Sequence, residues 1–172
     1  MTKEAAFAEL YKTHYRQVRG LCRQLLGSPE RAEDAAQEAF IRAYRAYDRY
    51  DPTQPFLAWI MQIARNHCLD ILRRRSTETA LFGREDEEAV AAVAAPDPDS
   101  LGAALGAERA AAVNAAVAKL PEKYRVPLAL AYFADSSYDE IAAELGITRT
   151  HVGVLLCRGK QMLRKSLAED SP

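Results

Sequence analysis

Residues 56–75 read FLAWIMQIARNHCLDILRRR, and this stretch decides the fold class of the N-terminal half of the chain. Apolar side chains recur at helical spacing, and the predicted stripe comprises Phe56, Ile60, Ile63, His67 and Ile71. The opposite side carries Gln62, Arg65, Asn66 and Arg73, with Trp59 at its edge. Such side chains can contact phosphates, base edges and unstacked bases. The alternative is an ordinary amphipathic helix whose terminal arginines suit the helix dipole.

Two further helices are predicted upstream, over about residues 3–26 and 29–47. Gly27 is suited to end the first helix. Ser28, Pro29 and Glu30 then supply an N-cap, a proline at the first helical position and an acid in the first turn. Residues 48–55 contain two prolines and two aspartates, which predict a loop before the helix that starts at Phe56.

Charge divides the 172 residues into three segments. Residues 1–75 hold 13 Lys/Arg and 9 Asp/Glu (net +4), residues 76–107 hold 1 and 7 (net −6), and residues 108–172 hold 9 and 8 (net +1). The middle segment is rich in alanine, acids and proline, which predicts a flexible acidic linker. We therefore expect two helical domains, 1–75 and 108–172, joined by the linker 76–107.

Several classes of protein are disfavoured by composition. No apolar run approaches the ~20 residues that span a bilayer, and the N-terminus has no signal-peptide core, so we expect a cytoplasmic protein without membrane insertion. Cys22, Cys68 and Cys157 are far apart and form no metal-binding pattern, so no metal or cofactor is expected. Without a carboxylate pair, a phosphate loop or a His/Cys constellation, we expect neither an enzyme nor a small-molecule substrate.

Residues 138–163, YDEIAAELGITRTHVGVLLCRGKQML, have the order of a helix-turn-helix. A short helix ends at Gly146, and Thr148 caps a second helix whose predicted buried stripe is Val152, Leu156, Gly159 and Leu163. The residues expected to face outward are Thr150, Val154, Cys157 and Gln161, with Arg158 beside them and Arg149 and His151 on the first turn. The alternative is a helical hairpin within a bundle.

Three segments together resemble the extracytoplasmic-function sigma factors of bacterial RNA polymerase. Residues 34–44, DAAQEAFIRAY, resemble the segment that binds the polymerase clamp. Residues 56–75 resemble the segment that melts the promoter and recognises the −10 element. Residues 120–125, LPEKYR, together with 138–163, resemble the −35 recognition domain. The chain departs from many members at Gly153 and Leu155, where they carry Lys and Arg.

The resemblance implies an all-α protein of two small helical domains that binds core RNA polymerase and promoter DNA, with an anti-sigma factor as a further partner. The residues implied to bind polymerase are Asp34, Gln37, Glu38 and Ile41. Those implied for the −10 element are Tyr50, Asp51, Trp59, Gln62, Arg65, Asn66 and Arg73, and those for the −35 element are Arg149, Thr150, His151, Gly153, Val154, Cys157 and Arg158. The alternative function is a stand-alone helix-turn-helix regulator with an N-terminal sensing or dimerising domain.

Overall fold

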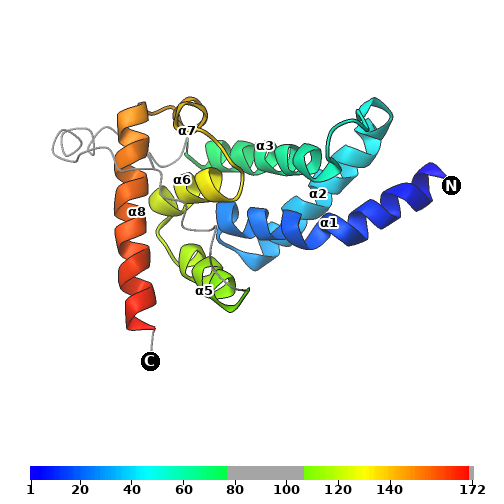
Figure 1. Ribbon diagram of the computed structural model, residues 1–172. Helices are drawn as coiled ribbons and strands as arrows, with labels where there is room; N and C mark the ends of the chain where they lie inside the picture. Colours follow the sequence, from blue (N-terminus) through cyan, green and yellow to red (C-terminus); the bar gives the residue numbers. More distant parts are fainter. Residues whose placement is uncertain (77–106, 171–172) are drawn as a thin grey trace. The chain divides into compact units, whose positions relative to one another are not determined.

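The computed structural model of the chain describes residues 1–76 and 107–170, and all regular structure in these ranges is helical (Figure 1). Backbone contacts divide the chain into two compact units, Met1–Arg75 (unit 1) and Ser76–Pro172 (unit 2). The predicted all-α fold is confirmed. The predicted linker lies almost wholly outside the described residues.

Unit 1 consists of α1 (Lys3–Leu26), α2 (Pro29–Ala46), the 3-10 turn η1 (Tyr47–Arg49) and α3 (Phe56–Ser76). The predicted boundary between α1 and α2 is confirmed, because Gly27 adopts a left-handed φ of 73° and the Ser28 hydroxyl accepts a hydrogen bond from the Arg31 amide. α1 and α2 pack against each other side by side (Figure 1).

An aromatic cluster ties the N-terminal part of α1 to α2 and to the start of α3. The Phe7 ring makes edge-on contacts with Phe40, Tyr44, Tyr47 and Phe56, at centroid distances between 5.2 and 6.2 Å. Edge-to-face pairs of this kind contribute roughly 0.5–1.5 kcal/mol beyond the burial of their area. This cluster fixes where the loop between α2 and α3 begins and ends.

The buried side of α3 differs from the predicted stripe. Phe56 and Ile60 are buried as expected, but Ile63, His67 and Ile71 are only partly buried. The buried residues that continue the stripe are Ala64, Cys68, Leu69 and Leu72. The prediction was wrong because it favoured large side chains, whereas the small Ala64 and Cys68 fill this side of the helix.

Cys68 of α3 meets Cys22 of α1 in the core of unit 1. Both side chains have no exposed surface, and their thiols are hydrogen-bonded to each other. That hydrogen bond, together with burial, raises the pKa of the Cys68 thiol. The two thiols therefore act as small core side chains that join the helices, because a buried thiol of high pKa is unreactive.

Unit 2 consists of α5 (Ala107–Ala118), α6 (Glu122–Tyr132), α7 (Tyr138–Leu145) and α8 (Arg149–Glu169). The long helix α8 packs against α5, α6 and α7. The predicted stripe of Val152, Leu156, Gly159 and Leu163 is buried. A Cβ atom at Gly159 would lie 2.7 Å from Leu128 Cδ1, so glycine allows α8 to approach α6 closely.

The predicted helix-turn-helix order of α7 and α8 is confirmed at the start of α7, at the turn and at the start of α8. The Ser137 hydroxyl accepts a hydrogen bond from the Glu140 amide and caps α7. Gly146 ends α7 with a left-handed φ of 67°, and the Thr148 hydroxyl accepts from the His151 amide and caps α8. Within the described ranges, no helix is both long and apolar enough to cross a membrane.

Candidate functional site

The outer face of α2 carries the residues that the family resemblance assigns to polymerase binding. Asp34, Gln37 and Ile41 are exposed, and Glu38 is partly exposed. Ile41 keeps 46% of its surface in solvent, which is high for a large apolar side chain. Arg42 Nε donates to Glu38 Oε1 over 3.0 Å, and this hydrogen bond lowers the pKa of the Glu38 carboxyl. The face therefore combines acids and an amide with an exposed apolar residue, a composition suited to a partner protein.

The loop between α2 and α3 is held by its own hydrogen bonds. Asp51 Oδ1 accepts from the Thr53 amide over 2.9 Å and from the Thr53 hydroxyl over 2.7 Å. These two donors lower the pKa of the Asp51 carboxyl. The Tyr50 hydroxyl donates to the Gln54 carbonyl oxygen, and the Gln54 amide donates to the Asp51 carbonyl oxygen over 3.1 Å. The loop thus has a defined shape in the free chain.

Tyr50 and Trp59 bring the loop and α3 together. Their ring centroids lie 4.8 Å apart with the planes inclined by 35°. Phe56 supports both rings, at 5.6 Å from Tyr50 and 5.7 Å from Trp59. Both Tyr50 and Trp59 keep part of their surface in solvent, so each can present an aromatic edge or face to a base.

A polar stripe continues from Trp59 along α3. Gln62, Asn66 and Arg73 are exposed and follow one another at helical spacing, whereas Arg65 is partly buried. Arg73 Nη1 lies 3.3 Å from Asp70 Oδ1. The structure therefore brings Tyr50, Trp59, Gln62 and Asn66 onto one side of unit 1, next to the arginines at the end of α3.

The N-terminal half of α8 is more buried than the sequence predicted. Arg149 and Thr150 are exposed, and Cys157 and Arg158 are partly exposed. His151 and Val154 keep only 1% and 3% of their surface in solvent, and Gly153 is also buried. The predicted outward positions of His151 and Val154 are therefore wrong in the free chain. The reason is the composition of this part of α8. Small and apolar side chains gain free energy from burial, whereas the Lys and Arg that many family members carry at positions 153 and 155 would stay in solvent.

Arg149 is oriented by α7. Its Nη1 lies 3.1 Å from Asp139 Oδ2, and its guanidinium lies 5.9 Å from the centre of the Tyr138 ring. Asp139 is not among the site residues predicted from the sequence. The capping pattern that starts α7 was the available signal, since it places Asp139 in the first turn of the helix that packs on α8.

Thr53 and Gln54 lie in the predicted loop and fix its shape, but they are not among the site residues predicted from the sequence. The signal was present, because aspartate followed two residues later by threonine is typical of a side-chain turn. In the described parts of the chain, no group of three or more His, Cys, Asp or Glu residues could hold a metal ion.

Comparison with known proteins identifies both units. Residues 10–78 match the Sigma-70 region 2 family, and residues 110–163 match the Sigma-70 region 4 family. The ECF RNA polymerase sigma factor SigW of Bacillus subtilis is 32% identical over 168 residues, which cover 95% of this chain and 90% of the relative. The chain belongs to the ECF family of RNA polymerase sigma factors.

Other relatives agree with this membership. The RNA polymerase sigma factor CarQ of Myxococcus xanthus is 31% identical over 165 residues, covering 95% of this sigma factor and 90% of the relative. The fold matches that of the sigma factor RpoE from Bartonella quintana, whose structure was solved in complex with the anti-sigma factor NepR. The TM-score is 0.54 at 20% identity, over 96% of this chain and 99% of the other.

Family membership decides between the two functions considered from the sequence. The sigma factor binds core RNA polymerase and directs promoter-specific transcription initiation. A stand-alone regulator with a sensing domain is not favoured, because region 2 and region 4 are both present and in order.

Proposed function

We propose that unit 1 captures the −10 element as single-stranded DNA and that α8 of unit 2 docks on the −35 duplex. In this proposal Asp34, Gln37, Glu38 and Ile41 hold core polymerase. The observation that carries the −10 assignment is the pre-formed loop, whose Tyr50 ring packs on Trp59 at the head of the exposed α3 stripe.

The free energy gained when this surface captures a strand is comparable with the cost of opening the duplex. Stacking one unpaired base on an aromatic side chain is worth ~1–3 kcal/mol, and extruding a base costs a few kcal/mol. Because the loop is already ordered by Asp51 and Thr53, binding does not have to order it. Gln62 and Asn66 can then bond base edges, while Arg65 and Arg73 neutralise phosphates.

The −35 assignment divides the residues of α8 by exposure. Arg149 and Thr150 are the exposed residues of the first turn of α8, and the first turn is the part of a recognition helix that reads base edges. Arg158, which is partly exposed further along α8, is assigned to a phosphate. Contacts from His151, Gly153, Val154 and Cys157 remain part of the proposal, and they require that this side of α8 opens to DNA.

Three further assignments belong to the same proposal. The sigma factor acts in the cytoplasm, contributes no catalytic step of its own, and is held in check by an anti-sigma factor. Its domains are taken as residues 1–75 and 108–172, with residues 76–107 linking them through the polymerase.

The test is permanganate footprinting of a duplex promoter with reconstituted holoenzyme, which reads the open bubble directly. Asn66→Ala is expected to reduce the reactive thymines in the −10 region, because it removes a base-edge contact. Gln17→Ala is the matched control, since Gln17 is an exposed amide on α1 outside the proposed surface. Equal bubbles for the parent, the Asn66 variant and the control would refute the strand-capture role of α3.

A further inference from the structure

An ion pair joins the first turn of α1 to the turn η1, although the two residues are 45 positions apart in the chain. Lys3 Nζ donates to Asp48 Oδ2 over 2.9 Å. The Thr2 hydroxyl accepts from the Ala5 amide and caps α1, so the turn that carries Lys3 has a defined direction. The hydrogen bond to Asp48 raises the pKa of the Lys3 ammonium, so Lys3 stays charged at neutral pH.

Lys3 stands at the end of α1 that disfavours a cation. The dipole of a helix favours acids near its N-terminus and cations near its C-terminus. Lys3 is the first residue of α1, so the local energetics of the helix oppose it. Its ammonium instead bonds Asp48 and lies 4.9 Å from the centre of the Tyr44 ring. A side chain that conflicts with its local position and satisfies a distant contact is expected where function requires that contact.

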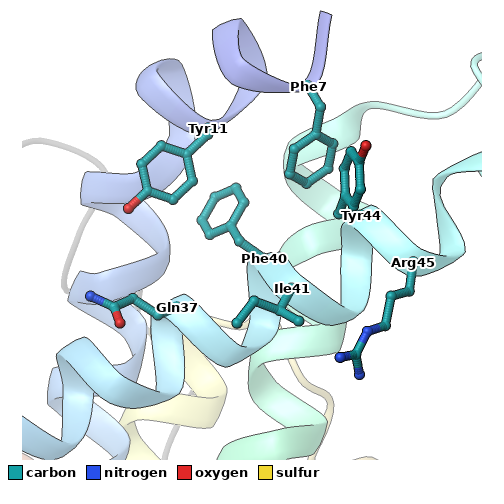
Figure 2. Close-up of a pocket in the computed structure, with 7 residues that line it drawn as sticks. All are labelled: Phe7, Tyr11, Gln37, Phe40, Ile41, Tyr44 and Arg45. Carbon is teal, nitrogen blue, oxygen red and sulfur yellow. The ribbon is translucent and has the colours of Figure 1, made fainter. Parts of the chain in front are cut away.

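The first two turns of α1 also hold the end of α2 from which η1 continues. The Tyr44 hydroxyl donates to Oε1 of Glu4, the neighbour of Lys3, over 3.3 Å. The Phe7 ring lies beside the Tyr44 ring, with centroids 5.2 Å apart (Figure 2). These two rings line an open groove between α1 and α2 with a volume of about 390 Å³ (Figure 2). The direction in which α2 leads into η1 is therefore set by contacts with α1.

Aromatic contacts carry this position from α1 to the loop. The Phe7 ring lies 5.4 Å from the ring of Tyr47, the first residue of η1. Tyr47 stacks on Tyr50, with centroids 5.9 Å apart and an angle of 15° between the planes. The Tyr50 amide also donates to the Tyr47 carbonyl oxygen over 3.1 Å. Because Tyr50 packs on Trp59, the orientation of η1 decides where the aromatic pair is presented.

We propose that the first turn of α1 positions the Tyr50–Trp59 pair for strand opening, with Lys3 and Asp48 as positioning residues of the −10 surface. The inference rests on the proposed capture of the −10 strand by unit 1. Neither Lys3 nor Asp48 has to touch DNA, because the ion pair holds η1 and η1 presents Tyr50. Asp48 keeps 76% of its side-chain surface in solvent, so the pair adds little to the stability of unit 1.

Lys3→Glu separates positioning from folding. An acid suits the N-terminus of α1, so the helix keeps its stability, whereas the contact with Asp48 becomes repulsive. We expect permanganate footprinting with reconstituted holoenzyme to show a −10 bubble reduced about two- to fivefold on a duplex promoter, the range of one exposed ion pair. Transcription from a template premelted at −10 should equal that of the parent.

Lys12→Glu is the matched control for this variant. Lys12 also lies on α1 and forms an exposed ion pair, but its partner is Glu9 of the same helix, over 3.4 Å. The control makes the same change of charge without touching η1, so it should open the promoter as the parent does. A bubble of equal size for the Lys3 and Lys12 variants would overturn the proposal. Equal losses on duplex and premelted templates by Lys3→Glu would overturn it as well.

Asp48→Lys excludes a general effect of charge on DNA binding. It changes the charge in the direction that favours DNA, yet we expect it to reduce the bubble because it breaks the same ion pair. The double variant Lys3→Glu/Asp48→Lys restores a pair of reversed polarity and should recover the bubble of the parent. A larger bubble with Asp48→Lys, or no recovery in the double variant, would overturn the proposal.

Acrylamide quenching of Trp59 fluorescence reads the position of the loop in the free sigma factor. Trp59 is the only tryptophan, and the Tyr50 ring packs on it. Lys3→Glu is expected to raise the quenching constant, because the displaced Tyr50 covers less of the indole, and the double variant should return it to the parent's value. An unchanged quenching constant for Lys3→Glu would show that the ion pair does not hold Tyr50 in place, and the proposal would be wrong.

Asn66→Ala separates this inference from the proposed function. If Asn66→Ala loses the bubble while Lys3→Glu keeps it, the positioning proposal is wrong and strand capture by α3 stands. If Asn66→Ala opens the promoter as the parent does, strand capture fails and the positioning proposal fails with it.

Discussion

Arg149 and Asp139 form an ion pair that links the first turn of α8 to the first turn of α7, with Arg149 Nη1 3.1 Å from Asp139 Oδ2. Both side chains are exposed, so the pair adds little to the stability of unit 2. The ion pair instead orients the side chain of Arg149, the proposed base-reading residue, towards α7 and over the Tyr138 ring. The predictions for the −35 element follow from this contact.

Arg149→Ala is expected to change the ranking of promoters in a randomised −35 library, because a lost base contact costs ~1–3 kcal/mol at one position only. Arg158→Ala is the comparison, and we expect it to lower transcription from all members alike, as a lost phosphate contact does. The measurement is sequencing of transcripts from the library with each holoenzyme. If the Arg149 variant kept the parent's ranking, the first turn of α8 would not be reading the promoter.

Asp139→Asn is expected to increase transcription across the −35 library and to flatten the preference at one position. The substitution removes a negative charge next to DNA, and it releases Arg149 from the ion pair that orients it. The measurement is sequencing of transcripts from the −35 library, repeated at low and high salt. Asp170→Asn, at the C-terminal end of α8, is the control for loss of one acid, and an effect equal to this control would contradict the prediction.

Asp51→Ala is expected to reduce transcription from a duplex promoter, because the Thr53 amide and hydroxyl lose their shared acceptor and the loop loses its shape. A template already melted at −10 should restore part of the activity, since the loop is then needed less for opening. Gln54→Ala is the control, because its backbone carbonyl still accepts from Tyr50. Equal losses on duplex and premelted templates would assign the loop a role other than strand opening.

Two glycine-to-alanine substitutions should have opposite effects on stability. Gly146→Ala should destabilise unit 2 by roughly 1–2 kcal/mol, because alanine at a φ of 67° is strained. Gly20→Ala should stabilise unit 1 by roughly 0.5–1 kcal/mol, because Gly20 lies inside α1 and a Cβ there meets no atom within 4 Å. Thermal unfolding followed by circular dichroism measures the stability of the Gly146→Ala variant. Unfolding followed by the fluorescence of Trp59, the only tryptophan, measures the stability of unit 1 in the Gly20→Ala variant.

His67 should make the stability of unit 1 depend on pH. Burial, and then the charge of Arg42, lower the pKa of this imidazole below its ordinary value of 6.5. Glu38 and Asp70 act in the opposite direction, and Arg74 reinforces the lowering. A depressed pKa means that the neutral ring is favoured in the folded state. The stability that the neutral His67 ring contributes to unit 1 is therefore fully present above pH 6.5, and it is lost as the pH falls through the pKa of His67 in the folded state.

The measurement is denaturant unfolding followed by Trp59 fluorescence at a series of pH values. His67→Gln should lose less stability than the parent between neutral pH and pH 5. Parallel pH profiles for the two proteins would show that His67 does not titrate differently in the folded and unfolded states.

The helices and their ends could be predicted because their determinants are local. Gly27, Ser28, Gly146 and Thr148 each act on backbone groups within a few residues, so the sequence alone places these boundaries. The order of the two sigma regions follows for the same reason, since each motif is a contiguous stretch of chain.

Tertiary structure decided which residues of those helices are covered and which groups meet. The pairing of Cys22 with Cys68, the ion pair of Asp139 with Arg149, and the groove between α1 and α2 all join segments from different helices. Helical periodicity assigns faces by residue size and polarity, so it placed Ile63 in the core and His151 and Val154 at the surface. Burial is instead decided by what packs against each face, and a neighbouring helix can cover a small or apolar residue on any side.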